Sequence, residues 1–538
     1  MNAQFYHGAE VIEVSAGARP VQIPSSSVIG IIGSAGKGPV NVPTKIAGNR
    51  LEAATKFGNY QDDGFTLPTA FDGILDQIGA TVVAINVCDP AVHNTAVTDE
   101  EITFDNTNKA KTNKPYVSAV STDTTVKAVI KFRSDDTIVL PAGITSVDAV
   151  KSADGVTTYT DPTDYTVASN VITRVDGQAI AANQEVEVTY TVTLVAGTDY
   201  DLNAETGEFT RLVTGNLVAF STIIVDYTYV DPTQVTNTDV IGGVDGTTGA
   251  YEGVQALLAA ASETGSKPKI LLAPGFTGSK ASPELANPVV ADLLTVAEKL
   301  KAVILADGPN TTDAEATAYR ADWDSDRLYI LDPAVKVLNP ESAAVESRPY
   351  SSVMAGIIAK TDRELGFWQS PSNRVINGII GVDRPVEFSM GDPDTRANQL
   401  NAQQITTIVR EGGGFRTWGN RVASSDTAKQ FLTRRRIADQ IAEGILSSVL
   451  WAIDRGITKK FVEEVLKTVK AYLRQLQSIG AIAGGDAWID TQLNTPETLS
   501  NGQLFIDYDF APTPTAERIT FRQSINNEYL TQIFSGNA

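Results

Sequence analysis

The chain has 538 residues, is 42% hydrophobic and 20% charged, and carries a formal net charge of -21. This length predicts about three domains, and the composition is typical of folded protein. The acidity argues against a nucleic-acid-binding surface, because phosphate neutralisation requires a basic face. The single cysteine, Cys88, excludes an intramolecular disulfide, and we expect a buried core thiol.

Neither a secretory signal peptide nor a membrane span is predicted. The N-terminus has no basic or strongly apolar stretch. No apolar run approaches the roughly 20 residues that cross a bilayer. We therefore expect the protein to be made in the cytoplasm and to remain there unless it leaves by lysis.

The first part of the chain predicts a separate strand followed by an α/β layer. Residues 9–15 read as a strand, which Gly17 and Pro20 separate from the rest. Such an isolated strand has unpaired N–H and C=O groups and needs a partner sheet, in the same chain or in another. Strands over 27–33 and 80–87 alternate with helices over 47–57 and 69–78, a rhythm that favours parallel pairing.

The segment 99–239 has a different composition. It is rich in Thr, Val and Asp, and alternating residues such as 185–194 predict half-buried antiparallel strands. It holds 21 acidic against 9 basic residues, which indicates a solvated outer face. The patterns at 163–174 and 188–192 recur at 198–211 and 225–229, so we predict a duplicated β unit.

The α/β rhythm resumes at about residue 240. The expected helices are 251–261, 289–301 and 314–321, and the expected strands are 269–273, 302–306 and 327–331. The segment 99–239 is therefore an insertion within one discontinuous α/β domain, formed by residues 21–98 and 240–375. Residues 351–360 near its end predict a helix of small residues.

Residues 376–511 predict an α+β domain. We expect helices over 403–410, 427–453 and 459–479, the last two amphipathic, and a strand over 504–510. Residues 411–480 hold 12 basic against 7 acidic residues, so this part is locally positive. Pro512 and Pro514 form a spacer before a last strand over 518–524, within a terminal segment 512–538.

Few residues indicate chemistry. Only His7 and His93 are present, without metal-ligand spacing, and we expect them to be exposed or satisfied. The glycine-rich loop 30–39 is not a P-loop, because its spacing is wrong and Gly38 stands where Ser or Thr should bind magnesium. The run Arg434 to Arg436 would spread around a helix and cannot form one flat basic stripe.

Several motifs together resemble the tail sheath proteins of contractile bacteriophage tails. The matching stretches, in the family's order, are 6–20 with 28–33, then 349–373, then 418–421 with 431–436, and finally 519–529. These stretches are distributed along nearly the whole chain except 99–239. One departure is Val422, where the family's turn continues with Thr.

The resemblance implies a mechanical protein without catalytic, cofactor or metal sites. Family members stack as hexameric rings around a tail tube, and baseplate and terminator proteins lie at the ends. Terminal strands of neighbouring subunits add to a sheet in a third subunit, and contraction moves subunits as near-rigid bodies. The expected location is the tail of the virion, after assembly in the host cytoplasm, without direct contact to nucleic acid or membrane.

Specific residues follow from this resemblance. Val11, Ile12, Val14, Ile519 and Phe521 would form the inter-subunit arm strands, and Gly17, Pro20, Pro512 and Pro514 their hinges. The family signature, at a domain junction or subunit contact, comprises Asp362, Arg363, Gly366, Trp368, Pro371 and Asn373. The tube-facing candidates are Arg434, Arg435, Arg436, Lys459 and Lys460.

Three alternatives remain open from the sequence. The same machine could serve a bacteriocin-type tail or an extracellular injection system. A nucleotide-dependent α/β enzyme is a second alternative, although the imperfect glycine loop argues against it. A cell-surface adhesin, suggested by the Thr-rich repeat, would need an export signal.

Overall fold

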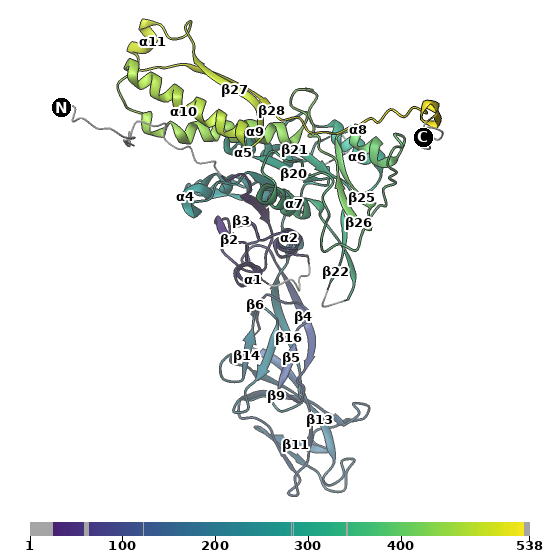
Figure 1. Cartoon of the computed structure of the whole chain (residues 1–538). Coiled ribbons are helices and arrows are strands. Elements are labelled where there is room, and N and C mark those ends of the chain that lie inside the picture. The colour runs from purple at the N-terminus through teal and green to yellow at the C-terminus, as the bar shows by residue number, and fades with distance from the viewer. Residues whose placement is uncertain are drawn as a thin grey trace, which may run out of the picture. The chain divides into compact units, whose positions relative to one another are not determined.

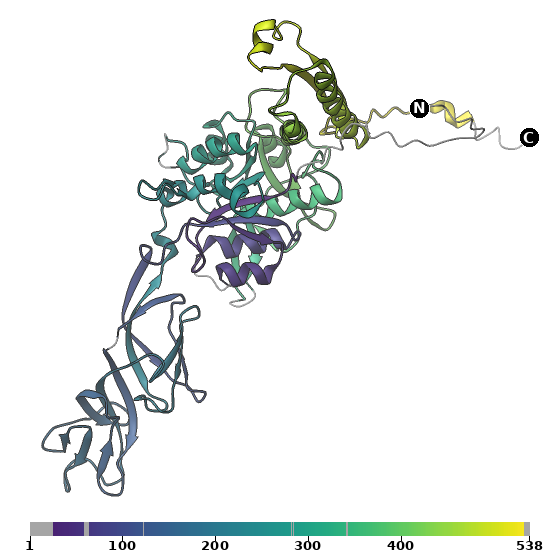
Figure 2. The same cartoon turned by 90° about the vertical axis from the view of Figure 1, so that its left-hand side faces the viewer.

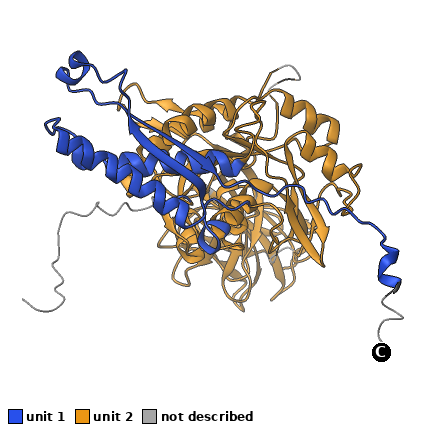
Figure 3. Cartoon of the chain, turned by 45° about the horizontal axis from the view of Figure 1, so that its top comes forward, with its two compact units in different colours: residues 1–26, 361–370, 432–538 blue, residues 27–360, 371–431 orange. Residues whose placement is uncertain are grey.

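The computed structural model describes residues 25–58, 64–121, 123–280, 282, 285–339 and 343–531. The expected arm residues Val11, Ile12 and Val14 and the hinge residues Gly17 and Pro20 lie outside this part of the chain. Two compact units are present (Figure 3). The larger unit comprises residues 27–360 and 371–431, and the smaller one the described parts of 1–26, 361–370 and 432–538.

The larger unit is built on an eight-stranded sheet (Figure 1). Its six central strands are parallel, and its two edge strands are antiparallel to their neighbours. The strand order is β2 (Thr44–Ala47), β3 (Thr81–Asn86), β1 (Ile29–Gly33), β19 (Ile270–Leu272), β20 (Val303–Asp307), β21 (Leu328–Leu331), β25 (Ile405–Glu411) and β26 (Gly414–Trp418). The central strands are continuous apolar runs, as expected where helices cover a parallel sheet.

The helices of the larger unit pack their apolar sides on the strands. They are α1 (Arg50–Phe57), α2 (Thr66–Leu75), α3 (Asn237–Ile241), α4 (Ala260–Thr264), α5 (Pro288–Leu300), α6 (Asp313–Ala321) and α8 (Arg396–Ala402). Leu293 and Val296 of α5 share a buried cluster with Ile304 and Ile330 of the sheet. Helices α1 and α2 lie side by side near β1 and β2 (Figures 1 and 2). Helix α7 (Tyr350–Glu364) begins in this unit, and residues 361–364 belong to the smaller one.

One expected helix is wrong, and another is helical but of a different type. Residues 403–410 instead contain β25, because the β-branched run from Ile405 to Val409 pairs with β21 and is buried. The expected helix 251–261 is replaced by the 3-10 helix Gly253–Ala259 followed by α4. Gly253 has φ +55 and cannot start a regular helix.

The predicted boundary near residue 376 also differs from the structure. Residues 371–431 belong to the larger unit, because β25 and β26 complete its sheet. The smaller unit starts its long helices later, with α9 (Leu432–Ser448) and α10 (Lys459–Ser478). Helix α9 is shorter than the expected 427–453, and the 3-10 helix Leu450–Ala452 follows it.

Small sheets complete the larger unit. One pairs β17 (Gly243–Val244) with β18 (Tyr251–Glu252), and another has the order β23 (Val345–Arg348), β22 (Val335–Leu338), β24 (Gly381–Val382). Between β3 and α3 the regular elements of the described residues are strands and one short 3-10 turn, as in an all-β insertion. Its strands are β4 (Asn94–Thr103), β5 (Lys109–Lys111), β6 (Val117–Val120), β7 (Asp123–Lys131), β8 (Thr137–Val139), β9 (Ile144–Ser152), β10 (Thr158–Tyr159), β11 (Tyr165–Ala168), β12 (Val171–Arg174), β13 (Glu185–Thr193), β14 (Tyr200–Asn203), β15 (Glu208–Arg211) and β16 (Thr222–Val230).

The insertion contains two equivalent arrangements, one nested inside the other. In one, β12 pairs with β8 and β13 with β7; in the other, β15 pairs with β5 and β16 with β4. An arginine occupies the same place in both. Arg174 donates from Nε to Asp136 and from Nη1 to the Ile180 carbonyl, and Arg211 donates in the same way to Asn108 and Leu217.

The insertion is anchored to the α/β core by Tyr116. Its ring meets Phe65 edge-on, with centroids 5.2 Å apart. Two glycines make room for it: a Cβ at Gly36 would lie 2.5 Å from the ring, and one at Gly58 would lie 2.1 Å from the hydroxyl. The glycine-rich loop after β1 therefore has a packing role, because glycine leaves room for a side chain that approaches the backbone this closely.

This packing predicts the outcome of a double-mutant cycle at Gly36. Gly36→Ala should destabilise the chain by about 1–3 kcal/mol, because the new methyl overlaps the Tyr116 ring. In a Tyr116→Ala background the same change should be neutral or slightly stabilising, since the space is then empty. Thermal unfolding of the four proteins checks this. Equal losses in both backgrounds would contradict the proposed contact.

Candidate assembly interface

The smaller unit carries a two-stranded antiparallel sheet. Strand β27 (Ile482–Ile489) pairs with β28 (Ile506–Pro512), with a bulge near Gly484. No other strand in the described part of the chain pairs with either of them. Both outer edges therefore present unpaired backbone groups, which can accept a further strand. The helix α11 (Pro496–Ser500) lies in the connection between the two strands.

One face of this hairpin is packed, and that packing supplies the stability that two strands lack on their own. Ala487 and Ile482 are buried with Tyr472 and Leu476 of α10, and Phe510 is half-buried against the same cluster. Helix α10 has the predicted amphipathic pattern, and its N-cap Thr458 accepts a hydrogen bond from the Phe461 N–H at 3.2 Å. The predicted helix 459–479 is thus confirmed, as is the strand predicted at 504–510.

The other face of the hairpin is polar and acidic. Asp486 lies directly opposite Asp509, and Trp488 opposite Asp507. The amide of Asp486 donates to the Asp509 carboxylate at 3.1 Å. Lys470 lies 2.7 Å from Asp486 and holds the pKa of that carboxyl below its usual value. Sequence analysis missed this face, although Asp507 and Asp509 alternate with apolar residues.

Apolar side chains of this unit are also exposed. Leu446, Leu450 and Ile453, at and beyond the end of α9, are 60%, 73% and 63% exposed. Trp488 and Leu493 add apolar surface on and after β27.

The C-terminal segment leaves the unit after a short tether. Thr513 Oγ1 donates to the Gly480 carbonyl at 2.7 Å, and the hydroxyls of Thr515 and Thr433 are 3.2 Å apart. Residues 513–526 form no regular element, so the strand predicted at 518–524 is absent from the isolated chain. Ile519 and Phe521 are 70% and 90% exposed, because no strand edge of the described residues pairs with them. Pro512 is the last residue of β28, and Pro514 lies within the tether.

A buried ion pair connects the three segments of the smaller unit. Both Arg436 Nη atoms donate to the Asp362 carboxylate, one of them at 2.8 Å, and the two side chains are 6% and 3% exposed. Ser26 donates from Oγ to Asp362 at 2.8 Å, and its carbonyl accepts from Arg436 at 3.1 Å. Bidentate pairing of this kind fixes geometry strongly. Sequence analysis singled out both charged residues but did not pair them.

The structure corrects the expected role of Arg436. Its guanidinium is enclosed by this pair and is not available to a tube protein. Arg435 pairs with Asp439 at 2.9 Å and is 19% exposed. Arg434 is half-buried, and Lys459 and Lys460 are exposed at the start of α10.

The signature residues are divided between the two units. Asp362, Arg363, Gly366 and Trp368 belong to the smaller unit. Gly366 has φ +106 and follows α7, and a Cβ there would lie 2.4 Å from the Trp368 ring. In the larger unit, Pro371 accepts a hydrogen bond from Thr417 Oγ1 at 2.6 Å, and the Asn373 amide donates to the Thr417 carbonyl at 2.7 Å.

The candidates for chemistry are all engaged in packing. Cys88 is buried as predicted, and burial raises its pKa to about 12. His93 is buried, and its Nδ1 accepts from the Asp89 amide at 2.9 Å; His7 lies outside the described residues. The loop after β1 is held by Asn86, which accepts from the Ala35 amide at 2.9 Å, and β2 follows it where a P-loop would start a helix.

The described residues contain no group of three or more His, Cys, Asp and Glu side chains that could hold a metal ion. Every helix within them is too short or too polar to span a bilayer.

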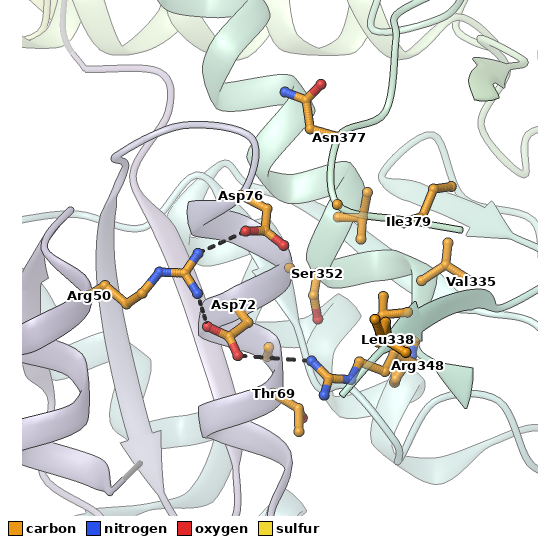
Figure 4. Close-up of a pocket in the computed structure, with 16 residues that line it drawn as sticks. Arg50, Thr69, Asp72, Asp76, Val335, Leu338, Arg348, Ser352, Asn377 and Ile379 are labelled. Atoms are coloured by element: carbon orange, nitrogen blue, oxygen red, sulfur yellow. Dashed lines mark hydrogen bonds and ion pairs between the residues drawn. The ribbon is translucent and has the colours of Figure 1, made fainter. Parts of the chain in front are cut away.

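A pocket of about 210 Å³ in the larger unit is closed by ion pairs (Figure 4). Arg50 bridges Asp72 and Asp76, the latter at 2.8 Å. Arg348 approaches Asp72 at 3.9 Å and Glu346 at 3.0 Å. Burial raises the pKa of Asp72 to about 6. The pocket thus joins α1, α2 and β23 through paired charges, and the hydroxyl-bearing residues Thr69 and Ser352 also line it.

The ion pair of the smaller unit predicts a large effect of single substitutions. Arg436→Leu should destabilise this unit by about 3–5 kcal/mol, because it leaves Asp362 buried without its partner. Replacing both residues, as Asp362→Leu with Arg436→Leu, should be milder than the single change. Lys459→Ala, which removes an exposed cation, is the matched control and should have little effect. Hydrogen exchange of α9 amides measures the loss; unchanged protection in Arg436→Leu would contradict the assignment.

Comparisons with known proteins identify the family. A model described as phage tail sheath protein central domain matches residues 249–423, and one described as phage tail sheath C-terminal domain matches residues 424–526. The chain is 33% identical to the tail sheath protein of Burkholderia phage BcepMu over 551 residues, which covers 100% of both chains. It is 41% identical to a putative prophage major tail sheath protein of Pseudomonas aeruginosa, over 55% of this chain and 74% of that one.

A crystal structure of a sheath tail protein from Listeria innocua is similar at TM-score 0.47 and 12% identity, covering 92% of this chain and 94% of that chain. The full-length match to the Burkholderia phage protein carries the assignment. The chain therefore belongs to the phage tail sheath family, whose members are structural subunits and not enzymes.

Proposed function

We propose that this sheath subunit polymerises as stacked hexameric rings around a tail tube and that contraction of the polymer drives the tube through the host envelope. The observation that supports polymerisation most directly is the hairpin β27–β28, whose two edges are open among the described residues. Its place is the virion tail, after assembly in the host cytoplasm. Its further partners are the tube protein and, at the ends, baseplate and terminator proteins.

Subunits are held together by strand exchange. The hairpin offers two edges, and the segment after Pro512 offers exposed apolar residues in alternation. Terminal strands from neighbouring copies complete the sheet through main-chain hydrogen bonds, while side chains select the register. Residues 1–20 supply the second arm, with Val11, Ile12 and Val14 in its strand and Gly17 and Pro20 in its hinge.

Contraction is a rigid-body rearrangement with flexible connections. The units keep their packed cores, and Pro512 and Pro514 lie where the exposed segment leaves the smaller unit. Hinge motion of this kind requires only a few loop residues to change conformation. The extended sheath is the metastable form, and the contracted form buries more surface between subunits. No nucleotide or metal is required.

Removal of the C-terminal segment tests this account. A chain ending at Thr515 should fold normally, because residues 516–530 are exposed in the isolated chain. It should fail to polymerise, since it lacks the strand that a neighbour must receive. Circular dichroism checks the fold, and negative-stain microscopy the tubes. A truncated chain that forms tubes of normal length and yield would refute arm exchange.

We further propose that the start of α10 faces the tube. Lys459 and Lys460 are exposed in its first turn. Cations are unfavourable there, because a helix N-terminus carries partial positive charge. Helix stability therefore does not explain them, whereas an acidic partner would. Arg434 is a further candidate, and the acidic insertion would point outward.

Charge reversal tests this orientation. Lys459→Glu with Lys460→Glu should leave self-polymerisation intact and should weaken assembly on the purified tube by about tenfold, most clearly at low salt. Lys109→Glu with Lys111→Glu, on strand β5 of the insertion, is the matched control. Cosedimentation with tubes measures both. If the control loses tube binding and the α10 variant does not, the orientation is reversed.

The same architecture also fits the sheath of a bacteriocin-type tail or an extracellular injection system. Neighbouring capsid and terminase genes would distinguish a phage from these devices. A nucleotide-dependent enzyme has no support in the loop after β1, whose backbone is bound by Asn86.

A further inference from the structure

We propose that Tyr251 of one subunit places its phenol ring in the pocket of the larger unit of a neighbouring subunit. This inference rests on the proposed polymerisation and adds to it a contact between larger units, independent of the terminal arms. The occupant of the pocket is thus a side chain from a second copy of this chain. The chemistry of the pocket and the surface around Tyr251 carry the inference.

The pocket is lined by both paired charges and apolar side chains. Two arginines and two aspartates line it, so positive and negative groups are equal in number; they are Arg50, Arg348, Asp72 and Asp76. Figure 4 shows the aspartates across the pocket from the apolar side chains of Val335, Leu338 and Ile379. A charged ligand would enter this pocket without a counter-charge. A neutral ligand with an apolar body is therefore the better match.

One buried hydroxyl at the pocket has no hydrogen-bond partner. Ser352 lies in the first turn of α7, lines the pocket and is 3% exposed. Its Oγ neither donates nor accepts a hydrogen bond within the described part of the chain, which is unfavourable for a buried hydroxyl. Because a hydroxyl can both donate and accept, a ligand that brings a hydroxyl of its own would satisfy Ser352.

The volume of the pocket admits an aromatic ring. It is about 210 Å³, and an engineered apolar cavity of about 150 Å³ binds benzene. Among the neutral side chains, tyrosine alone joins a six-membered ring to a hydroxyl group. Serine and threonine lack the apolar body, and the indole of tryptophan donates but cannot accept. The chemical class that fits the pocket is therefore a phenol.

Tyr251 presents such a group at the surface. It lies in β18 directly opposite Val244 of β17, and the two side chains are 42% and 60% exposed. Within the described part of the larger unit, Tyr251 is the one exposed tyrosine. The turn between the two strands is fixed, because the Asp245 carboxylate accepts from the Thr247 amide at 2.6 Å. A rigid hairpin of this kind loses little conformational freedom when it binds.

The mouth of the pocket matches the surroundings of Tyr251. Leu338 of β22 lines the pocket and lies directly opposite Val345 of β23, and these side chains are 53% and 57% exposed. As the Tyr251 ring enters, Val244 would come to lie against this apolar pair. Apolar contacts around a central aromatic anchor exclude water from it.

The positions of the two surfaces suit an open polymer. The strand β18 packs against the 3-10 helix Gly253–Ala259, which leads into α4. Figure 1 shows α4 and β22 on opposite sides of the α/β core. A contact between two different surfaces of the same chain is heterologous, and it generates rings or helical filaments, whereas a contact between like surfaces ends at a dimer. A sheath requires the heterologous kind.

A small phenol tests the chemistry of the pocket. The fluorine NMR line of 4-fluorophenol should broaden with the unassembled full chain and stay sharp with Val337→Trp, which fills the pocket. 4-Fluoroanisole, which cannot donate a hydrogen bond, should bind several-fold more weakly. In assembled tubes the 4-fluorophenol line should stay sharp, because Tyr251 occupies the pocket. Equal binding to tubes and to the unassembled chain would overturn the proposed occupant.

Substitutions test the contact itself. Tyr251→Ser should raise the critical concentration for polymerisation about tenfold, and Val337→Trp should do the same. The chain with both changes should be no worse than either alone, because both remove one contact. Phe220→Ser, which removes a 66% exposed aromatic ring from the insertion, is the matched control and should assemble normally. Light scattering measures polymerisation, and circular dichroism confirms that each variant is folded.

Cross-linking tests whether the contact joins different copies. In tubes of a chain with Tyr251→Cys and Leu338→Cys, a short bismaleimide should produce a ladder of dimers, trimers and longer products. Chains with either cysteine alone should remain monomers, since Cys88 is buried and should not react. The absence of a ladder from such tubes would overturn the contact.

The outcomes separate this inference from the function on which it rests. If the wild-type chain forms no tubes, the proposed function fails. If wild-type tubes form but Tyr251→Ser assembles at the wild-type concentration, or the losses from Tyr251→Ser and Val337→Trp add, the contact at the pocket is wrong while the proposed function stands.

Discussion

The open edges of a two-stranded sheet are the constraint on which the smaller unit depends. Two strands form a marginal structure on their own, and here helix α10 stabilises only one face of them. Their outer edges retain backbone donors and acceptors that a further strand would satisfy. A monomer with such a sheet is poised for association. In the proposed polymer, further strands would add to a sheet that is already folded, and the cores would need no rearrangement.

The rest of the smaller unit keeps this sheet in place. The unit draws on segments around residue 26, residues 361–370 and the region from 432 onward. The buried pair of Asp362 and Arg436 joins all three, and Tyr472 packs α10 onto α9 through its hydrogen bond to the Gln440 carbonyl at 3.1 Å. A force that pulls on a terminal strand would therefore be resisted by the buried bidentate ion pair between Asp362 and Arg436. The larger unit contributes a parallel sheet and an insertion anchored by Tyr116.

Local sequence patterns predicted many of the helices and strands, whereas the features that were not predicted depend on pairing between residues far apart in the chain. The amphipathic α10, the apolar central strands and the alternating strand β28 could be predicted, because neighbouring residues carry their periodicity. The strand at Ile405 was mistaken for a helix, since only its pairing with β21 decides between the two. The Asp362–Arg436 contact joins residues 74 positions apart, and the nested order of the insertion interrupts one repeat with another. The acidic outer face could have been predicted from the alternation of acidic and apolar residues in β28, but it was not.

The central claim is that neighbouring chains complete the sheet formed by the hairpin β27–β28. A cryo-electron microscopy map of tubes assembled from the full chain tests it most directly. The account predicts a continuous strand from the terminal segment of one subunit beside the hairpin β27–β28 of another. A map in which both edges of this hairpin are free would contradict it.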